Sequence, residues 1–111
     1  MSTIKVGCAP IAWVNDDMPT LGGETTYQQI LSEVALAGYA GTEIGNKYPK
    51  DPAVLSGELE LRGIKIAAAW HGCLLTTEPY EVEEAKFIAF RDYMAALGAD
   101  CINICEQGHS I

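Results

Sequence analysis

Carboxylate and imidazole side chains stand at the ends of apolar stretches in this sequence, where they could transfer protons. Glu43 lies between two glycines in the stretch GTEIG, and His71 directly follows the apolar stretch GIKIAAAW. Asn103 lies within a third stretch, DCINICE. A carboxylate and an imidazole held close together can act as general base and general acid. Such a site requires a fold that brings residues distant in the sequence into one cavity.

The elements that would position these residues alternate regularly. Apolar, β-prone stretches predict strands at residues 4–9, 41–45, 63–72 and 100–106. Helices are expected between them, at residues 26–38, 51–63 and 80–98. Helix signals support this pattern: capping-box spacing from Thr26 to Gln29, Asp51 as N-cap before Pro52, and closing glycines at 38, 63 and 98. The order β-α-β-α-β-α-β predicts a parallel sheet with right-handed crossovers.

Side chains alternate between the two faces of a strand, and the third strand shows a clear division. Ile64, Ile66, Ala68 and Trp70 share one face, which we expect to pack on helices. The other face carries Lys65, Ala67, Ala69 and His71, and is small along its middle. The corresponding faces of the other strands carry Glu43 and Asn103 among small residues. We therefore expect Glu43, His71 and Asn103 to line a cavity at the carboxyl ends of the strands.

Structural roles remain open for each of these residues. Glu43 could instead form an ion pair with Lys5, His71 could be a hydrogen-bonded surface residue, and Asn103 could bind a backbone amide. The long loop after the first strand contains Trp13, which could cover an apolar edge or contact a substrate ring. Its Asp16 and Asp17 are expected to be turn or solvent residues. Glu106 and His109, after the last strand, could perform acid–base chemistry or be exposed to solvent.

Composition narrows the class of protein. With 111 residues and 49% apolar content, the chain predicts one domain, residues 1–111, with no internal boundary. The net charge of -8 argues against a nucleic-acid partner.

No apolar run approaches the ~20 residues of a membrane span, and no signal-peptide pattern precedes the first strand, so a cytoplasmic location is expected. The four cysteines form no C-x-x-C pair and are expected to be free thiols, with a structural zinc site as the less favoured alternative. Nucleotide-binding and serine-hydrolase motifs are also missing from the sequence.

Several longer stretches resemble the inosose dehydratases of myo-inositol degradation, which are xylose-isomerase-like barrels. These stretches are GCAPIAWVNDDMP, AGYAGTEIG, LELRGIKIAAAWHG and ICEQGHSI, and they occur in the expected order. The resemblance covers almost the whole chain. It implies a (β/α)8 TIM barrel of about 250 residues, of which this chain supplies strands one to four as an N-terminal half.

The resemblance also implies a reaction. Such a lyase removes water from 2-keto-myo-inositol, with Mn²⁺ or Co²⁺ polarising the ketone and stabilising an enediolate. The metal ligands of the superfamily lie on later strands, so we expect none here and an inactive chain. By resemblance, Glu43 and His71 bind polyol hydroxyls or help proton transfer, and Trp13 and Asn15 close the first loop over the ring. Further substrate contacts are expected from Asn103, Glu106 and His109.

Other functions are compatible with the same barrel. A sugar isomerase or epimerase would use the same enediolate chemistry. A non-catalytic half-barrel would have open edges at its first and fourth strands, which could pair with a second copy. A role in DNA repair is disfavoured by the net charge of -8.

Overall fold

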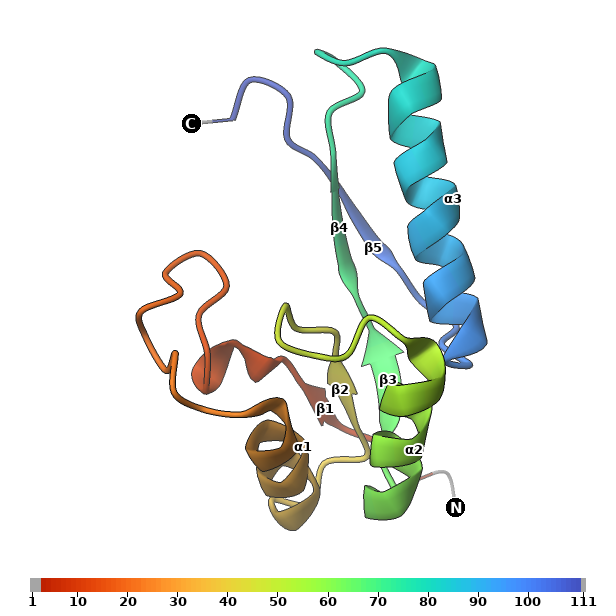
Figure 1. Cartoon of the computed structure of the whole chain (residues 1–111). Coiled ribbons are helices and arrows are strands. Elements are labelled where there is room, and N and C mark those ends of the chain that lie inside the picture. Colours follow the sequence, from red (N-terminus) through yellow and green to blue (C-terminus); the bar gives the residue numbers. More distant parts are fainter. Residues whose placement is uncertain (1–2, 111) are drawn as a thin grey trace.

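The computed structural model describes residues 3–110 and has an open α/β architecture (Figure 1). Strands β1 (Gly7–Cys8), β2 (Gly41–Glu43) and β3 (Lys65–Ala68) form one parallel sheet, in that order. Strands β4 (Trp70–Cys73) and β5 (Asn103–Glu106) form a second parallel pair. A 3₁₀ turn, η1 (Pro10–Ala12), follows β1. The α/β class and parallel pairing predicted from the sequence are confirmed, and the arrangement is consistent with half of a TIM barrel.

The three predicted helices are confirmed, with the expected end signals for the first two. The helices are α1 (Tyr27–Leu36), α2 (Pro52–Arg62) and α3 (Tyr80–Ala96). The Thr26 hydroxyl accepts a hydrogen bond from the Gln29 amide at 3.2 Å, at the start of α1. Asp51 caps α2 in the same way through the Ala53 amide at 2.9 Å, and Gly63 ends that helix with a φ of 66°. A left-handed residue at this position suits glycine because it lacks a Cβ.

The third predicted strand differs from the expectation because it is broken at Ala69. Its first part, β3, pairs with β2, whereas its continuation, β4, pairs with β5. Figure 1 shows β3 and β4 nearly in line, with the chain passing from one sheet to the other. Ala69 is fully buried at the break, and its carbonyl accepts a hydrogen bond from the Asn103 amide at 2.8 Å. The chain therefore passes from one sheet to the other at Ala69.

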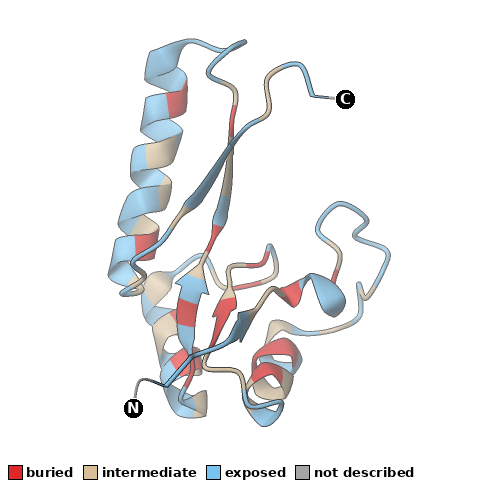
Figure 2. Ribbon diagram, turned by 180° about the vertical axis from the view of Figure 1, so that it is seen from behind, coloured by how far each residue is buried: buried red, intermediate tan, exposed pale blue. Residues whose placement is uncertain are grey.

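The buried core lies between the first sheet and its helices, as the red segments in Figure 2 show. It combines aliphatic side chains of α1 and α2 with those of β3, and Met94 of α3 joins them. The main buried residues are Ile30, Leu31, Val34, Leu55, Leu59, Ile64, Ile66 and Met94. The β4–β5 pair is less covered, because every residue of β5 is exposed. The lower part of the molecule in Figure 2 therefore provides most of the buried apolar contact.

Both outer strands have an open edge within the described residues. β1 pairs only with β2, and β5 pairs only with β4. Apolar side chains near these edges are exposed: Ile4 by 86%, Val6 by 56% and Ile104 by 57%. Within residues 3–110, no helix combines the length and apolar character needed to cross a membrane.

Candidate functional site

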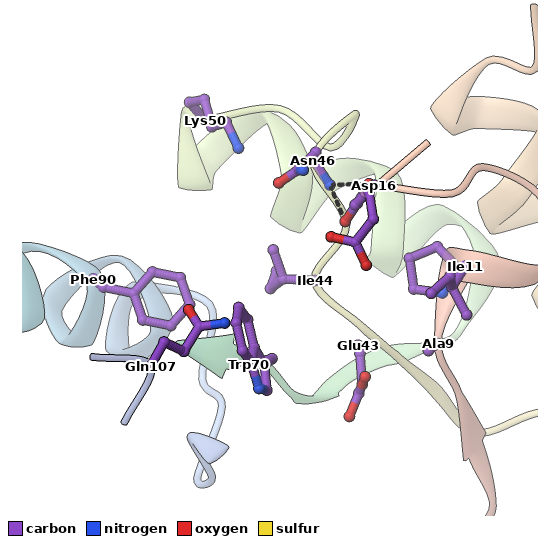
Figure 3. A pocket seen from close by; sticks show the side chains of 12 residues that line it. Ala9, Ile11, Asp16, Glu43, Ile44, Asn46, Lys50, Trp70, Phe90 and Gln107 are labelled. Atoms are coloured by element: carbon purple, nitrogen blue, oxygen red, sulfur yellow. Dashed lines mark hydrogen bonds between the residues drawn. The ribbon is translucent and has the colours of Figure 1, made fainter. Parts of the chain in front are cut away.

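A cavity of about 530 Å³ lies at the carboxyl ends of β1 and β2 and beside β4 (Figure 3). Its wall combines carboxylates, amides, one lysine and two aromatic rings. The lining residues are Ala9, Pro10, Ile11, Asp16, Asp17, Glu43, Ile44, Asn46, Lys50, Trp70, Phe90 and Gln107. The sequence predicted a cavity at this end of the strands. Polar groups converging with an aromatic ring are typical of small-molecule sites.

Small residues bring the strands together below this cavity. A Cβ added to Gly7 would lie 3.2 Å from the Cβ of Ala67, and one added to Gly41 would lie 2.7 Å from the Lys65 carbonyl oxygen. Any larger side chain at position 41 would therefore push β3 away. The inner face that the sequence indicated is confirmed as far as Ala67.

Glu43 ends β2, and its side chain lines the cavity as predicted (Figure 3). The β2–β3 register shifts at this point: Thr42 pairs with Ile66, but Glu43 pairs with Ala68. The alternative ion pair with Lys5 does not occur, and Glu43 takes part in no ion pair among residues 3–110. The Glu43 carboxylate is therefore available to a ligand.

Asp16 lies in an exposed turn, as the sequence predicted, and it also lines the cavity. Its carboxylate accepts the Asn46 amide at 3.3 and 3.4 Å. The turn that presents it is shaped by Asn15, whose side-chain oxygen accepts the amides of Asp17 at 2.9 Å and Met18 at 3.0 Å. Asn15 thus shapes the loop. Contrary to the prediction, it does not line the cavity. Asparagine commonly makes such local turns, so its presence at position 15 was a signal for this one.

Trp13 does not lie over the cavity either. Its indole nitrogen donates a hydrogen bond to Glu33 of α1, and its ring packs against the core. Hydrogen bonds from Gln29 and then Trp13 hold the pKa of the Glu33 carboxyl below its usual value, although desolvation opposes this. The Lys47 ammonium donates to the Thr25 carbonyl at 2.7 Å and also binds the Gly23 carbonyl. The Trp13–Glu33 bond fastens the loop to α1, and Lys47 ties the end of the loop to the segment after β2. Trp13 therefore anchors the loop and contributes no cavity wall.

Trp70 supplies the aromatic wall instead, on the face where the sequence predicted His71. The indole is 55% exposed and lies beside Gln107 in the cavity (Figure 3). A one-residue shift in strand register moves all later side chains to the opposite face. The shift between β2 and β3 occurs just before Ala69, and beyond it Trp70 faces the cavity. The predicted assignment of faces is therefore wrong after Ala67.

His71 consequently faces α3, away from Glu43. Its ring stacks on Phe90 at a centroid distance of 5.1 Å and meets Phe87 edge-on at 5.6 Å. It lines a second cavity of about 380 Å³ together with Glu83, whose carboxylate binds Lys86 at 2.8 Å. The Nε2 atom of His71 is buried and has no hydrogen-bond partner among residues 3–110. The structure therefore does not form the expected Glu43–His71 pair.

The remaining predicted substrate contacts lie outside the first cavity. The Glu106 carboxylate accepts the Leu75 amide at 2.7 Å and the Thr76 hydroxyl at 3.0 Å, which fastens the loop after β4. Desolvation raises its pKa, but hydrogen bonds from Gly108, Thr76 and Leu75 outweigh this and lower it. Asn103 pairs with Trp70 across the β4–β5 ladder without lining the cavity. His109 is exposed, with a φ of 62°.

Metal ligation requires a closer group of donors than the described residues provide. Within residues 3–110, no group of three or more His, Cys, Asp or Glu side chains could hold a metal ion. Asp16, Asp17 and Glu43 line the cavity, but they do not form such a group. The donor set of residues 3–110 does not by itself fit Mn²⁺ or Co²⁺.

A buried pair of hydroxyl groups lies behind the cavity. Tyr48 is 2% exposed, and its hydroxyl lies 2.9 Å from the hydroxyl of fully buried Thr42. Burial raises the pKa of Tyr48 to about 12; the hydrogen bond with Thr42 opposes this, whereas Cys8 and Asp16 add to it.

Tyr48 predicts a loss of stability at alkaline pH. Its folded pKa of about 12 exceeds the ordinary value of 10.0, so the unfolded chain loses this proton first as pH rises. The contribution is complete below pH 10 and is lost towards pH 12, with a magnitude of roughly 3 kcal/mol. Urea denaturation across this range should show a steeper loss of unfolding free energy for the wild type than for Tyr48→Phe. Equal losses would contradict this prediction.

Comparison with known proteins places these features in context. No protein-family model matches the chain. The chain is 58% identical over 109 residues to a protein named inosose dehydratase from Lacticaseibacillus casei, covering 98% of this chain and 37% of the relative. Proteins of the same name from Clostridium botulinum and Clostridium perfringens are each 57% identical, over 97% and 99% of this chain and 36% and 37% of the relatives. The resemblance predicted from the sequence is confirmed, and the chain spans little more than a third of these relatives.

Proposed function

We propose that this chain is part of an inosose dehydratase, and that the cavity lined by Glu43 and Trp70 binds 2-keto-myo-inositol. The whole enzyme would be a lyase of myo-inositol degradation. The observation that carries this proposal is the 58% identity over 98% of the chain to a protein named inosose dehydratase. The names of these relatives favour a dehydratase over the isomerase or epimerase alternative.

The cavity has the chemistry that a cyclic polyol ketone needs. Such a ring has apolar C–H faces and a rim of hydroxyl groups. The exposed indole of Trp70 provides a flat apolar surface for a C–H face. Carboxylate, amide and ammonium groups around it can pair with the rim, from Glu43, Asp16, Asn46, Lys50 and Gln107. Pairing matters because each buried hydroxyl without a partner weakens binding by about 1–3 kcal/mol.

Within this cavity, Glu43 is the group that we assign to proton transfer. Elimination of water next to a ketone requires removal of the α-proton and protonation of the departing hydroxyl. The Glu43 carboxylate can accept the α-proton, which is then available to the departing hydroxyl. The Lys50 ammonium, which also lines the cavity, can favour the negative charge that develops on the substrate. His71 lines the other cavity and has no part in this assignment.

A divalent metal would complete the whole enzyme. The resemblance implies Mn²⁺ or Co²⁺, which would polarise the ketone. We propose that its ligands come largely from parts of the relatives that this chain does not match. The isolated chain would then bind substrate without dehydrating it.

A chimaera tests the proposed function. The matching segment of the Lacticaseibacillus casei relative would be replaced by this chain, and the loss of water from 2-keto-myo-inositol measured in both proteins. We expect kcat/KM within roughly tenfold of the parent, a difference of about 1.4 kcal/mol. A chimaera with the parent's circular dichroism and Tm but no dehydration would contradict the proposal. Isomerisation of the ketone without loss of water would favour the isomerase alternative.

We also propose that the isolated chain associates with a second copy through its open strand edges. Free backbone groups on β1 and β5 can pair, and exposed Ile104 lies on β5. The net charge of -8 opposes contact between copies, so association should strengthen as salt screens the repulsion. Light scattering should show a dimer that increases with salt and is weakened by Ile104→Lys. A monomer at all salt concentrations would contradict this expectation.

A further inference from the structure

We infer that Thr42 and Tyr48 are positioning residues, which hold the backbone of Glu43 in place at a strand irregularity beside the cavity. This inference rests on the proposed function, because it assigns these two residues to the site that Glu43 forms. Neither hydroxyl touches the cavity itself. Their role follows from two hydrogen bonds and one shift of strand register.

The irregularity is a β-bulge. Gly41 pairs with Lys65 and Thr42 with Ile66, but Glu43 pairs with Ala68, so β3 contains one extra residue. The next backbone contact continues the shifted register, since the Ile44 amide donates to the Ala68 carbonyl at 3.2 Å. A bulge bends the strand and redirects the side chains that follow it. The extra residue lies in β3, so the bulge determines which face Trp70 occupies, whereas Glu43 keeps the inward face that alternation along β2 gives it.

The hydroxyl groups form a directed chain of hydrogen bonds at this bulge. The Thr42 hydroxyl donates its only proton to the Glu43 carbonyl oxygen at 2.9 Å. It can therefore only accept from Tyr48, whose hydroxyl lies 2.9 Å away. Tyr48 thus donates to Thr42, and Thr42 donates to the backbone of Glu43. This sequence of bonds connects the loop after β2 to the point where the register shifts.

Burial makes this arrangement specific. Thr42 is 0% exposed and Tyr48 is 2% exposed, so water cannot replace either partner. Aliphatic residues such as valine have the shape of threonine and could fill the same space. Apolar packing alone therefore gives no reason for a hydroxyl at position 42. The hydroxyl is explained by the carbonyl that it holds.

Three substitutions separate positioning from general stability. Thr42→Val removes the hydroxyl and keeps the shape, Thr42→Ser keeps the hydroxyl, and Tyr48→Phe removes only the first donor. Hydrogen exchange of the Ile44 amide reports on the bulge without any ligand. We expect Thr42→Val to speed this exchange at least tenfold relative to amides elsewhere in β2, with Tyr48→Phe intermediate and Thr42→Ser near the wild type.

Ligand binding then tests the connection to Glu43. Titration of the 111-residue chain with 2-keto-myo-inositol, followed by tryptophan fluorescence, gives Kd for each variant. Thr42→Val should raise Kd roughly tenfold, and Thr42→Ser should restore it. In a Glu43→Gln background, Thr42→Val should raise Kd no further, because it acts through that carboxylate.

Different results would refute the positioning role of the two hydroxyls and the proposed substrate site. Unchanged Ile44 exchange in both Thr42→Val and Tyr48→Phe would refute the positioning role, whatever the ligand does. A further rise of Kd in the Glu43→Gln background would also refute it. If Glu43→Gln leaves Kd unchanged, or the wild type does not bind, the proposed substrate site is wrong. In that case hydrogen exchange of the Ile44 amide still decides the role of the hydroxyls, because it needs no ligand. If Thr42→Val fails to fold, the exchange is measured in Tyr48→Phe.

Discussion

Glu43→Gln should lower kcat/KM for 2-keto-myo-inositol by on the order of 100-fold in the chimaeric dehydratase. Glutamine keeps the size of the side chain, but it binds a hydroxyl less strongly than a carboxylate does and it cannot accept the α-proton. General acid–base groups typically contribute about 10²–10⁴-fold to a rate. Because the group acts on the reacting proton, we expect the loss mainly in kcat, with a smaller change in KM.

The matched control is Glu60→Gln, which removes the same charge from an exposed position on α2. This variant should keep kcat/KM within about twofold of the unsubstituted chimaera, since long-range charge effects are weak in salt. If Glu43→Gln were as active as the Glu60 variant, Glu43 would have no role in proton transfer.

Leu55→Ala should destabilise the isolated chain by about 2–5 kcal/mol, the usual range for a buried leucine. Leu55 is 0% exposed in the core formed by α1, α2 and β3. Much of the buried apolar contact lies in that core. Removing the Leu55 side chain leaves a cavity there, because the surrounding residues relax only in part. Urea denaturation at a fixed protein concentration measures the change.

Leu61→Ala on the same helix is the control, because Leu61 is 79% exposed. Its free energy of unfolding should change by no more than about 0.5 kcal/mol. Similar losses for both variants would show that α2 does not pack on the core through Leu55.

Local signals in the sequence predicted the helices and their ends well. The caps at Thr26 and Asp51 and the closing Gly63 depend only on neighbouring residues, and all three are present in the structure. Alternation along the strands was also correct as far as Ala67, because each strand to that point keeps a regular period. These features needed no knowledge of how the strands pair.

The composition of the site could be predicted only in part. The bulge between β2 and β3 is a property of two paired strands, so alternation within one strand could not reveal it. As a result Trp70, and not His71, faces the cavity with Glu43. Asp16 was missed for a local reason, since the turn made by Asn15 determines where it points. Glu106 was misassigned because its hydrogen bonds come from a loop about 30 residues earlier in the sequence.

The location of the ligand is the most direct test of this account. Amide and indole chemical shifts of the isotope-labelled chain would be recorded while 2-keto-myo-inositol is added. We predict that the largest shifts occur at Glu43, Asp16, Asn46 and the indole of Trp70, which surround the first cavity. Shifts concentrated at His71 and Phe87, in the second cavity, would contradict the account, as would the absence of shifts at saturating ligand.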